Sequence, residues 1–115
     1  MNKPKRFGMV IGIRPEKISE YKELHANTWP EILKNMEDAN MRNFSIYLAE
    51  LEKGKFYLFG YYEYTGDDFE ADMKKMKDCD ISDKWSALCT SCQIPLDTRD
   101  EGQWWMDMEE VFHTD

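Results

Sequence analysis

The feature that most constrains the fold is a pair of aromatic-rich segments, residues 43–50 (NFSIYLAE) and 55–64 (KFYLFGYYEY). Bulky side chains alternate along both segments, as expected of β-strands, in which successive side chains point to opposite faces. Lys53 and Gly54 stand between the two segments, and a glycine in so short a connection is typical of a tight turn. The pattern therefore predicts an antiparallel hairpin with bulky side chains on both faces.

The rest of the chain predicts two more strands and several helices. Alternation predicts a half-buried strand over residues 5–13, and the segment 104–113 (WWMDMEEVFH) is expected to be the last strand. The spacing of apolar residues and the Pro and Gly positions predict helices over 16–27, 31–39, 69–78 and 82–92, with a loop over 94–103. The pair Asp67–Asp68 and the residue Ser82 are expected to cap the last two helices.

The order of these elements is β-α-β-β-α-β, which is the ferredoxin-like arrangement of the α+β class. It predicts one antiparallel sheet with helices on one face, in a single domain that spans residues 1–115. The helices suffice to cover only one face, while bulky side chains lie on both. We therefore expect a homodimer in which two sheets pack face to face.

Charge and hydropathy exclude several kinds of partner. The net charge of -8 would repel a phosphate backbone and an anionic membrane surface, so neither nucleic acid nor membrane is expected as a partner. The longest apolar run is a handful of residues, too short for a transmembrane helix. The first residues, MNKPKRFG, lack the apolar region of a signal peptide, so a cytoplasmic location is expected.

The cysteines Cys89 and Cys92 form a C-x-x-C pair, which is compatible with redox chemistry or with half of a zinc site. Zinc needs four ligands, and the chain offers only Cys79 and two histidines besides. A thioredoxin-like pair would begin a helix, whereas this pair closes an apolar one. Buried, inert thiols are therefore favoured.

Candidate catalytic residues are few, because the chain has no Gly-rich phosphate loop, no G-x-S-x-G and no H-E-x-x-H. His25 follows Tyr21 by four residues, so both project from one helical face towards the core. Spacing alone slightly favours a core histidine satisfied by one hydrogen bond. The alternative is an acid/base pair that faces a pocket. His113, near the C-terminus, is expected to be a surface side chain.

Three motifs carry a resemblance to a known family. They are Y-K-E-L-H-A-N-T-W-P-E at 21–31, N-F-S-I-Y-L at 43–48 and W-x-x-M-E-E-V-F-H at 105–113. The first resembles the Tyr-x3-His-x3-Trp-Pro-Glu signature of the L-rhamnose mutarotase family, and the others are similar to that family's second-strand and C-terminal motifs. The resemblance runs from about Phe7 to His113 and implies a dimeric α/β barrel of the ferredoxin-like kind.

The resemblance also implies site residues. His25 would be the catalytic proton donor, and Tyr21 would contact the substrate. The family's second-strand tyrosine corresponds to Phe44 here, and its Trp-Trp pair corresponds to Lys84 and Trp85. Phe44 lacks the hydroxyl and Lys84 replaces an aromatic ring with a cation. These two departures leave the sugar open between L-rhamnose and L-fucose. Lys84 is also compatible with a solvated lysine that pairs with nearby aspartates, which we favour slightly.

The implied reaction is aldose 1-epimerisation, the interconversion of the α and β anomers of a 6-deoxy-hexose through acid/base opening of the ring. It involves no redox change or phosphate, so no cofactor and no metal are expected. Two alternatives stay open on sequence grounds. One is a dimeric sugar- or metabolite-binding module without catalysis, and the other is a small cofactorless oxygenase of the same fold.

Overall fold

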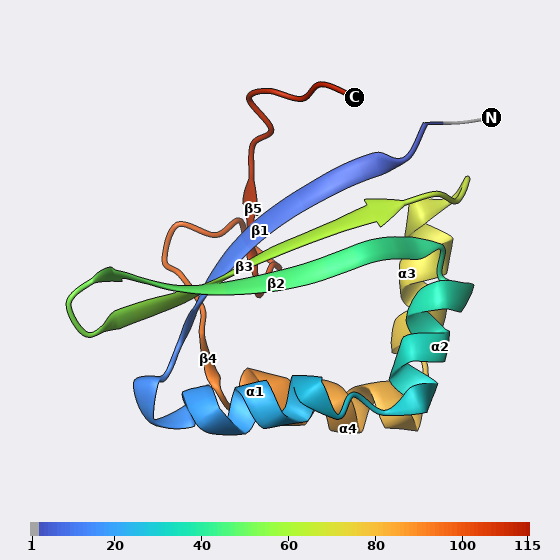
Figure 1. The fold of residues 1–115 in the computed structure, drawn as a ribbon. Helices are drawn as coiled ribbons and strands as arrows, with labels where there is room; N and C mark the ends of the chain where they lie inside the picture. The colour runs from blue at the N-terminus through green and yellow to red at the C-terminus, as the bar shows by residue number, and fades with distance from the viewer. Residues whose placement is uncertain (1–2) are drawn as a thin grey trace.

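The computed structural model describes residues 3–115 and shows an antiparallel sheet with helices on one face (Figure 1). The strands are β1 (Lys5–Ile13), β2 (Met41–Glu52), β3 (Lys55–Tyr64), β4 (Gln93–Ile94) and β5 (Met106–Met108). Their order is β2-β3-β1-β4, and β5 also pairs with β1. The helices are a 3-10 turn η1 (Pro15–Lys17), α1 (Ile18–Ala26), α2 (Pro30–Asp38), α3 (Phe69–Lys77) and α4 (Asp80–Thr90). The predicted α+β, ferredoxin-like fold is confirmed.

The register of the long strands gives the sheet two different faces. In β1 and β3, Ile11 pairs with Leu58, and both are almost completely buried under the helices. We call this the covered face. In β2 and β3, Tyr47 pairs with Phe59 on the opposite side, which we call the open face. Tyr47 is 66% exposed there, so the two faces of one hairpin meet very different surroundings.

The covered face holds two adjoining cores. The first surrounds Ile11, Ile13 and Leu58 and includes Tyr21 of α1 and Cys89 of α4. The second lies at the other end of the sheet, where α2 and α3 pack on it, and its members are Ala39, Met41, Tyr62, Phe7, Met9, Met36, Phe44, Phe69, Met73 and Met76. The helix pairs α1–α4 and α2–α3 therefore each cover one part of the sheet (Figure 1).

Two glycines allow close approach to the middle of the sheet. A Cβ on Gly12 would lie 2.9 Å from the carbonyl oxygen of Ile94, so glycine lets β4 lie against β1. A Cβ on Gly60 would lie 3.4 Å from Trp105 and 2.9 Å from the end of Met9. The missing side chains thus make room for the segments that follow α4.

Three expectations about the C-terminal half are wrong. Only residues 106–108 of the predicted strand 104–113 pair with β1, and beyond Met108 the tail leaves the sheet edge, where Glu110 binds Arg6. The predicted 82–92 helix is α4, which spans Asp80–Thr90, and residues 93–94 pair with β1 as β4. The loop expected over 94–103 therefore runs over residues 95–105. Ser82 does not cap α4, since its hydroxyl donates instead to the backbone oxygen of Met76.

Other local predictions hold. Asp68 caps α3, because its carboxylate accepts from the backbone N–H of Ala71 at 3.1 Å. Gly54 closes the hairpin at a φ of 79°, a value that glycine adopts without strain.

None of the helices in the described part of the chain is long and apolar enough to cross a membrane. Residues 1–2 of the expected single domain lie outside the described residues.

Candidate functional site

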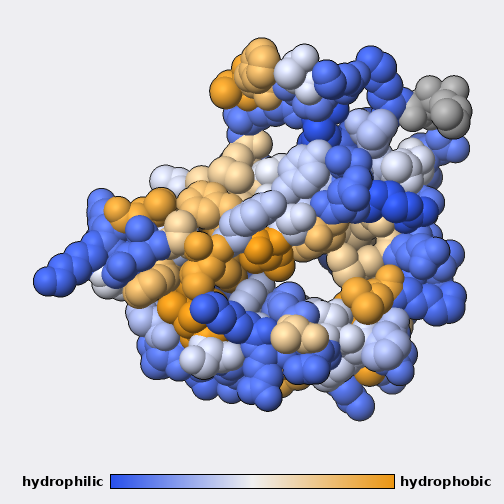
Figure 2. Space-filling view, viewed as in Figure 1, coloured by the Kyte–Doolittle hydropathy of each residue, from blue (hydrophilic) through white to orange (hydrophobic). Residues whose placement is uncertain are grey.

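A cleft opens between the covered face and the helices, and Figure 2 shows this hollow with hydrophobic side chains along its rim. Its volume is roughly 1510 Å³. That exceeds the ~300–1,000 Å³ of ordinary small-molecule pockets, so a single monosaccharide would fill only part of it. The aromatic residues that line it are Tyr21, His25, Phe44, Trp85, Trp104 and Trp105.

The structure brings together four of the five predicted site residues. Tyr21 and His25 reach the cleft from α1, Trp85 reaches it from α4, and Phe44 reaches it from β2. Lys84 is the exception, because its side chain is exposed on α4 and is not part of the cleft lining. The helical rotation of about 100° per residue turns Lys84 away from the cleft that Trp85 lines.

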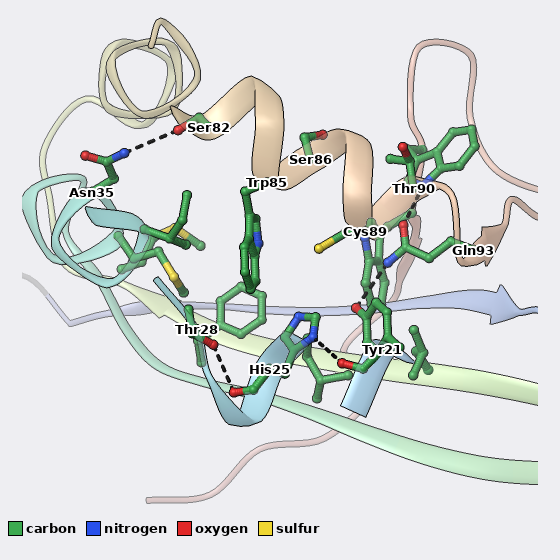
Figure 3. A pocket seen from close by; sticks show the side chains of 18 of the residues that line it. Tyr21, His25, Thr28, Asn35, Ser82, Trp85, Ser86, Cys89, Thr90 and Gln93 are labelled. Atoms are coloured by element: carbon green, nitrogen blue, oxygen red, sulfur yellow. Dashed lines mark hydrogen bonds between the residues drawn. The ribbon is translucent and has the colours of Figure 1, made fainter. Parts of the chain in front are cut away.

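The orientation of His25 follows from one hydrogen bond. Its Nδ1 lies 2.9 Å from the backbone oxygen of Tyr21, one turn earlier in α1. A carbonyl oxygen only accepts, so Nδ1 carries the hydrogen. In the neutral imidazole Nε2 is therefore an acceptor, and in the imidazolium it is a donor. Figure 3 shows the ring between Tyr21 and Trp85 in the cleft.

Aromatic rings hold His25 in this position. Its ring centroid is 4.2 Å from that of Tyr21 and 5.4 Å from that of Trp85, which it meets edge-on. Trp85 in turn meets Trp29, the residue just before α2, at 5.2 Å. The aromatic contacts restrict rotation of the imidazole and provide apolar faces on which the C–H groups of a sugar can pack.

Tyr21 is anchored by two residues that the sequence did not single out as site residues. Gln93 of β4 donates from Nε2 to the Tyr21 hydroxyl at 3.1 Å, and Trp104 donates from its indole to Gln93 Oε1 at 2.7 Å. Gln93 is 3% exposed. The signal in the sequence was only an amide placed between the apolar neighbours Cys92 and Ile94, which is too weak to identify a site residue on its own.

Burial sets the protonation of the groups around Tyr21. Removal from water raises the pKa of the Tyr21 phenol well above its ordinary value, so the phenol stays neutral at physiological pH. Burial likewise raises the pKa of the Cys89 thiol to about 12. Cys92 is also buried, and its thiol donates to Glu20 at 3.2 Å. Both thiols are unpaired, and their raised pKa values fit the inert role that the sequence favoured.

Comparison with known proteins identifies the family to which this chain belongs. The family model of L-rhamnose mutarotase matches residues 6–114, nearly the whole chain. The chain belongs to the L-rhamnose mutarotase family. The family is one of isomerases that act on carbohydrates, and the resemblance seen in the three sequence motifs is thereby confirmed.

Relatives within the L-rhamnose mutarotase family match over the full length. The L-rhamnose mutarotase of Oceanobacillus iheyensis is 31% identical over 111 residues, which cover 96% of this chain and 99% of the relative. That of Bacillus subtilis is 28% identical over 111 residues, with the same coverage.

Solved structures agree with the fold. The crystal structure of the L-rhamnose mutarotase of Formosa agariphila superposes with a TM-score of 0.70 at 20% identity and covers 96% of this chain and 99% of its own. A protein of Nitrosomonas europaea described as an antibiotic biosynthesis monooxygenase superposes with a TM-score of 0.52 at 12% identity over 100% of this chain and 99% of its own. Both likenesses show the fold alone.

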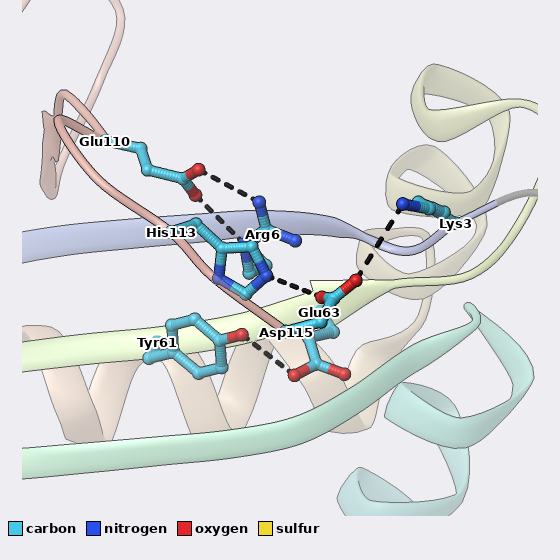
Figure 4. Close-up of polar contacts among 7 residues, drawn as sticks. All are labelled: Lys3, Arg6, Tyr61, Glu63, Glu110, His113 and Asp115. Atoms are coloured by element: carbon cyan, nitrogen blue, oxygen red, sulfur yellow. Dashed lines mark hydrogen bonds and ion pairs between the residues drawn. The ribbon is translucent and has the colours of Figure 1, made fainter.

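This member of the L-rhamnose mutarotase family carries a second polar cluster on the open face (Figure 4). Arg6 donates to both carboxylate oxygens of Glu110 at 2.9 and 3.0 Å. His113 lies 2.8 Å from Asp115, and Tyr61 donates to Glu63 at 2.8 Å. His113 is thus an exposed side chain in the C-terminal tail, as expected, and it lies outside the cleft lining.

Side chains that could bind a metal ion are not clustered in the part of the chain that the structure describes. Among residues 3–115, no three His, Cys, Asp or Glu side chains gather closely enough to hold a metal ion. Cys79, the remaining cysteine, contacts Ser82 and Asn35 between α2 and α4, away from Cys89 and Cys92. The zinc reading of the C-x-x-C pair therefore has no set of ligands in the described residues.

Proposed function

We propose that this chain catalyses the interconversion of the α and β anomers of L-rhamnose, with His25 as the proton donor. The observation that carries the proposal is the position of His25, whose Nε2 is free of the backbone and whose ring is held between Tyr21 and Trp85 in the cleft. Family membership supports the reaction and the sugar.

The reaction needs one proton taken and one proton given. A base removes the proton of the anomeric hydroxyl, and a C=O bond forms at the anomeric carbon as its bond to the ring oxygen breaks. The ring oxygen takes a proton from the acid. The aldehyde rotates, and the same hydroxyl then closes the ring on the other face by the reverse steps.

The His25 imidazolium supplies the proton from Nε2, since Nδ1–H is held by the Tyr21 carbonyl. After transfer, the neutral ring has its lone pair on the same Nε2 and can recover the proton in the closing step. Each well-placed acid or base typically contributes ~10²–10⁴-fold, so a pair of such groups suffices for this reaction. The base partner of His25 is a group or water in the same cleft.

The remaining cleft residues bind the sugar in this proposal. Trp85 offers an aromatic face beside His25, and Tyr21 offers a hydroxyl. Phe44 lies on the covered face, stacked on Tyr62 at 5.5 Å, and contributes an apolar wall without a hydroxyl. The sugar preference between L-rhamnose and L-fucose then depends on the cleft wall rather than on Lys84, which is exposed on α4.

The test is anomer exchange measured by NMR magnetisation transfer between the two anomeric protons of L-rhamnose and, in parallel, of L-fucose. We expect micromolar protein to accelerate exchange of L-rhamnose well above the rate in buffer. Sugar binding without any acceleration would replace the enzyme with the binding module considered above. Absence of both binding and acceleration for the two sugars would reject the cleft as a sugar site.

We also propose that the chain is a homodimer that packs open face on open face. Tyr47 is 66% exposed on β2, and Phe59 lies beside it across the strand pair. In the tail that follows β5, Val111 is 86% exposed and Phe112 is 79% exposed. A second copy of the sheet would cover such apolar side chains, which monomeric proteins rarely leave in water as one patch.

A further inference from the structure

We propose that Gln93 is a positioning residue that fixes the direction of the Tyr21 O–H bond, so that Tyr21 meets the sugar as a hydrogen-bond donor. The inference rests on the proposed function, because it assigns a role to Tyr21 in that same cleft. It follows from a short chain of hydrogen bonds, from Trp104 to Gln93 to Tyr21. Figure 3 shows the second of these bonds, between Gln93 and Tyr21.

The direction of the chain is set by Trp104. An indole N–H can only donate, so the atom of Gln93 that lies 2.7 Å from it must be the amide oxygen. The amide NH₂ group then faces the Tyr21 hydroxyl at 3.1 Å. An NH₂ group can only donate, and the Tyr21 oxygen must therefore accept.

The proton of Tyr21 is left for the cleft. Its oxygen already accepts from Gln93, and among residues 3–115 the Tyr21 hydroxyl donates to no protein acceptor. Tyr21 lines the cleft, and burial keeps its phenol protonated. A sugar oxygen in the cleft is the acceptor that completes the chain. His25 stands beside it with the opposite capacity in its neutral form, since its free Nε2 accepts.

This chain of hydrogen bonds from Trp104 through Gln93 to Tyr21, which we call the relay, is also rigid. Gln93 is 3% exposed, and its backbone pairs with Ile13 at the edge of the sheet. Both the side chain and the backbone of Gln93 are therefore fixed. Tyr21 is 4% exposed. A buried amide whose two ends are both satisfied does not flip without breaking two hydrogen bonds, and Tyr21 therefore keeps one orientation between turnovers.

The test uses the variant Gln93→Glu, which keeps the shape of the side chain but replaces the NH₂ donor with an acceptor. The Tyr21 proton would then turn towards residue 93 and away from the sugar. In the wild-type background we expect Tyr21→Phe to lower kcat/KM roughly fivefold, the loss of one neutral hydrogen bond. In the Gln93→Glu background the same change should cost less than about twofold.

Equal losses in the two backgrounds would overturn the proposal, because the two residues would then act independently. Thermal unfolding of each variant confirms that the fold is kept. Should Gln93→Glu fail to fold, Gln93→Met takes its place. That variant also removes the donor, and the loss caused by Tyr21→Phe should again shrink relative to the wild type.

A second readout does not depend on catalysis. With ¹³C-labelled tyrosine and no sugar present, the Cζ shift of Tyr21 reports whether its oxygen accepts a hydrogen bond. We expect Gln93→Met to move this shift and to leave the shift of the open-face Tyr47 unchanged. An unmoved Tyr21 shift would overturn the relay. A wild type that fails to accelerate anomer exchange would reject the proposed function while this measurement still decides the role of Gln93.

Discussion

The two faces of the sheet hold one histidine each, and the contrast between them shows what the cleft adds to an imidazole. His25, on the covered face, gives Nδ1–H to a neutral carbonyl and lies between aromatic rings. His113, on the open face, lies 2.8 Å from the Asp115 carboxylate. One ring nitrogen of His113 is thus occupied by the Asp115 carboxylate, whereas Nε2 of His25 contacts no protein partner among the described residues and lies in the cleft beside Tyr21. We therefore propose that the different partners of these two histidines suit His25, and not His113, to proton transfer.

The sharpest way to test this contrast is to remove each histidine in turn. We expect His25→Ala to lower kcat for anomer exchange by ~10²-fold or more, the loss of a true general acid. His113→Ala is the matched control, because it removes the only other histidine and leaves the cleft intact. Full activity in a folded His25→Ala variant would remove His25 from the mechanism.

The proposed dimer is tested by placing a charge on the open face of the sheet. Tyr47→Glu places a carboxylate in the proposed interface, and its burial there should weaken the dimer by ~10²-fold or more, since an unpaired buried charge costs several kcal/mol. Leu88→Glu on the exposed side of α4 is the control. Light scattering across a concentration series measures both variants. A wild type that stays near 13.7 kDa at micromolar concentration would contradict the dimer.

Trp85 and Lys84 test the contrast within a single helix. Trp85→Ala should raise the KM for L-rhamnose about tenfold, as expected for an aromatic contact of about 1–1.5 kcal/mol. Lys84→Ala should change neither KM nor kcat, because this side chain points to solvent. A sugar panel that includes L-fucose measures both. Altered specificity in Lys84→Ala would show that the lysine reaches the substrate after all.

The smallest expected effect concerns the ion pair on the open face. The hydrogen bond from Arg6 holds the pKa of Glu110 below its ordinary value of 4.5. The pair therefore stabilises the fold above pH 4.5, and this contribution is lost as the pH falls through the lowered pKa. We expect Glu110→Gln to unfold at a slightly lower temperature than the wild type at pH 6, with the gap closing towards pH 3. A gap that is constant with pH would exclude this linkage.

The sequence predicted the helices and strands in which apolar side chains recur at a regular spacing. The hairpin, the first strand and the helices that carry Tyr21 and Trp85 all show a regular spacing of apolar side chains, and their faces follow from it. Their positions brought four predicted site residues into one cleft. The family motifs, rather than the spacing, singled out His25 from an ordinary core histidine.

The sequence did not predict the structure of segments that have no regular spacing of apolar side chains. β4 has two residues, which is too short for any alternation to show, and yet it carries Gln93. The tail after Met108 does not continue the pairing with β1, and its Glu110 instead binds the side chain of Arg6. Contacts between segments far apart in the chain decide both cases, and a local pattern does not record them.

Gly12 has a consequence for how substitutions in this protein should be interpreted. Gly12 lies on the opposite side of β1 from the cleft, so its position alone suggests that it matters only for the packing of the sheet. Yet the absence of a Cβ there lets Ile94, and with it β4, rest against β1. A larger residue would push outward the strand on which Gln93 is mounted. We therefore expect substitution of Gly12 by a larger residue to displace Gln93 and to disturb the proposed site as well as the packing of the sheet.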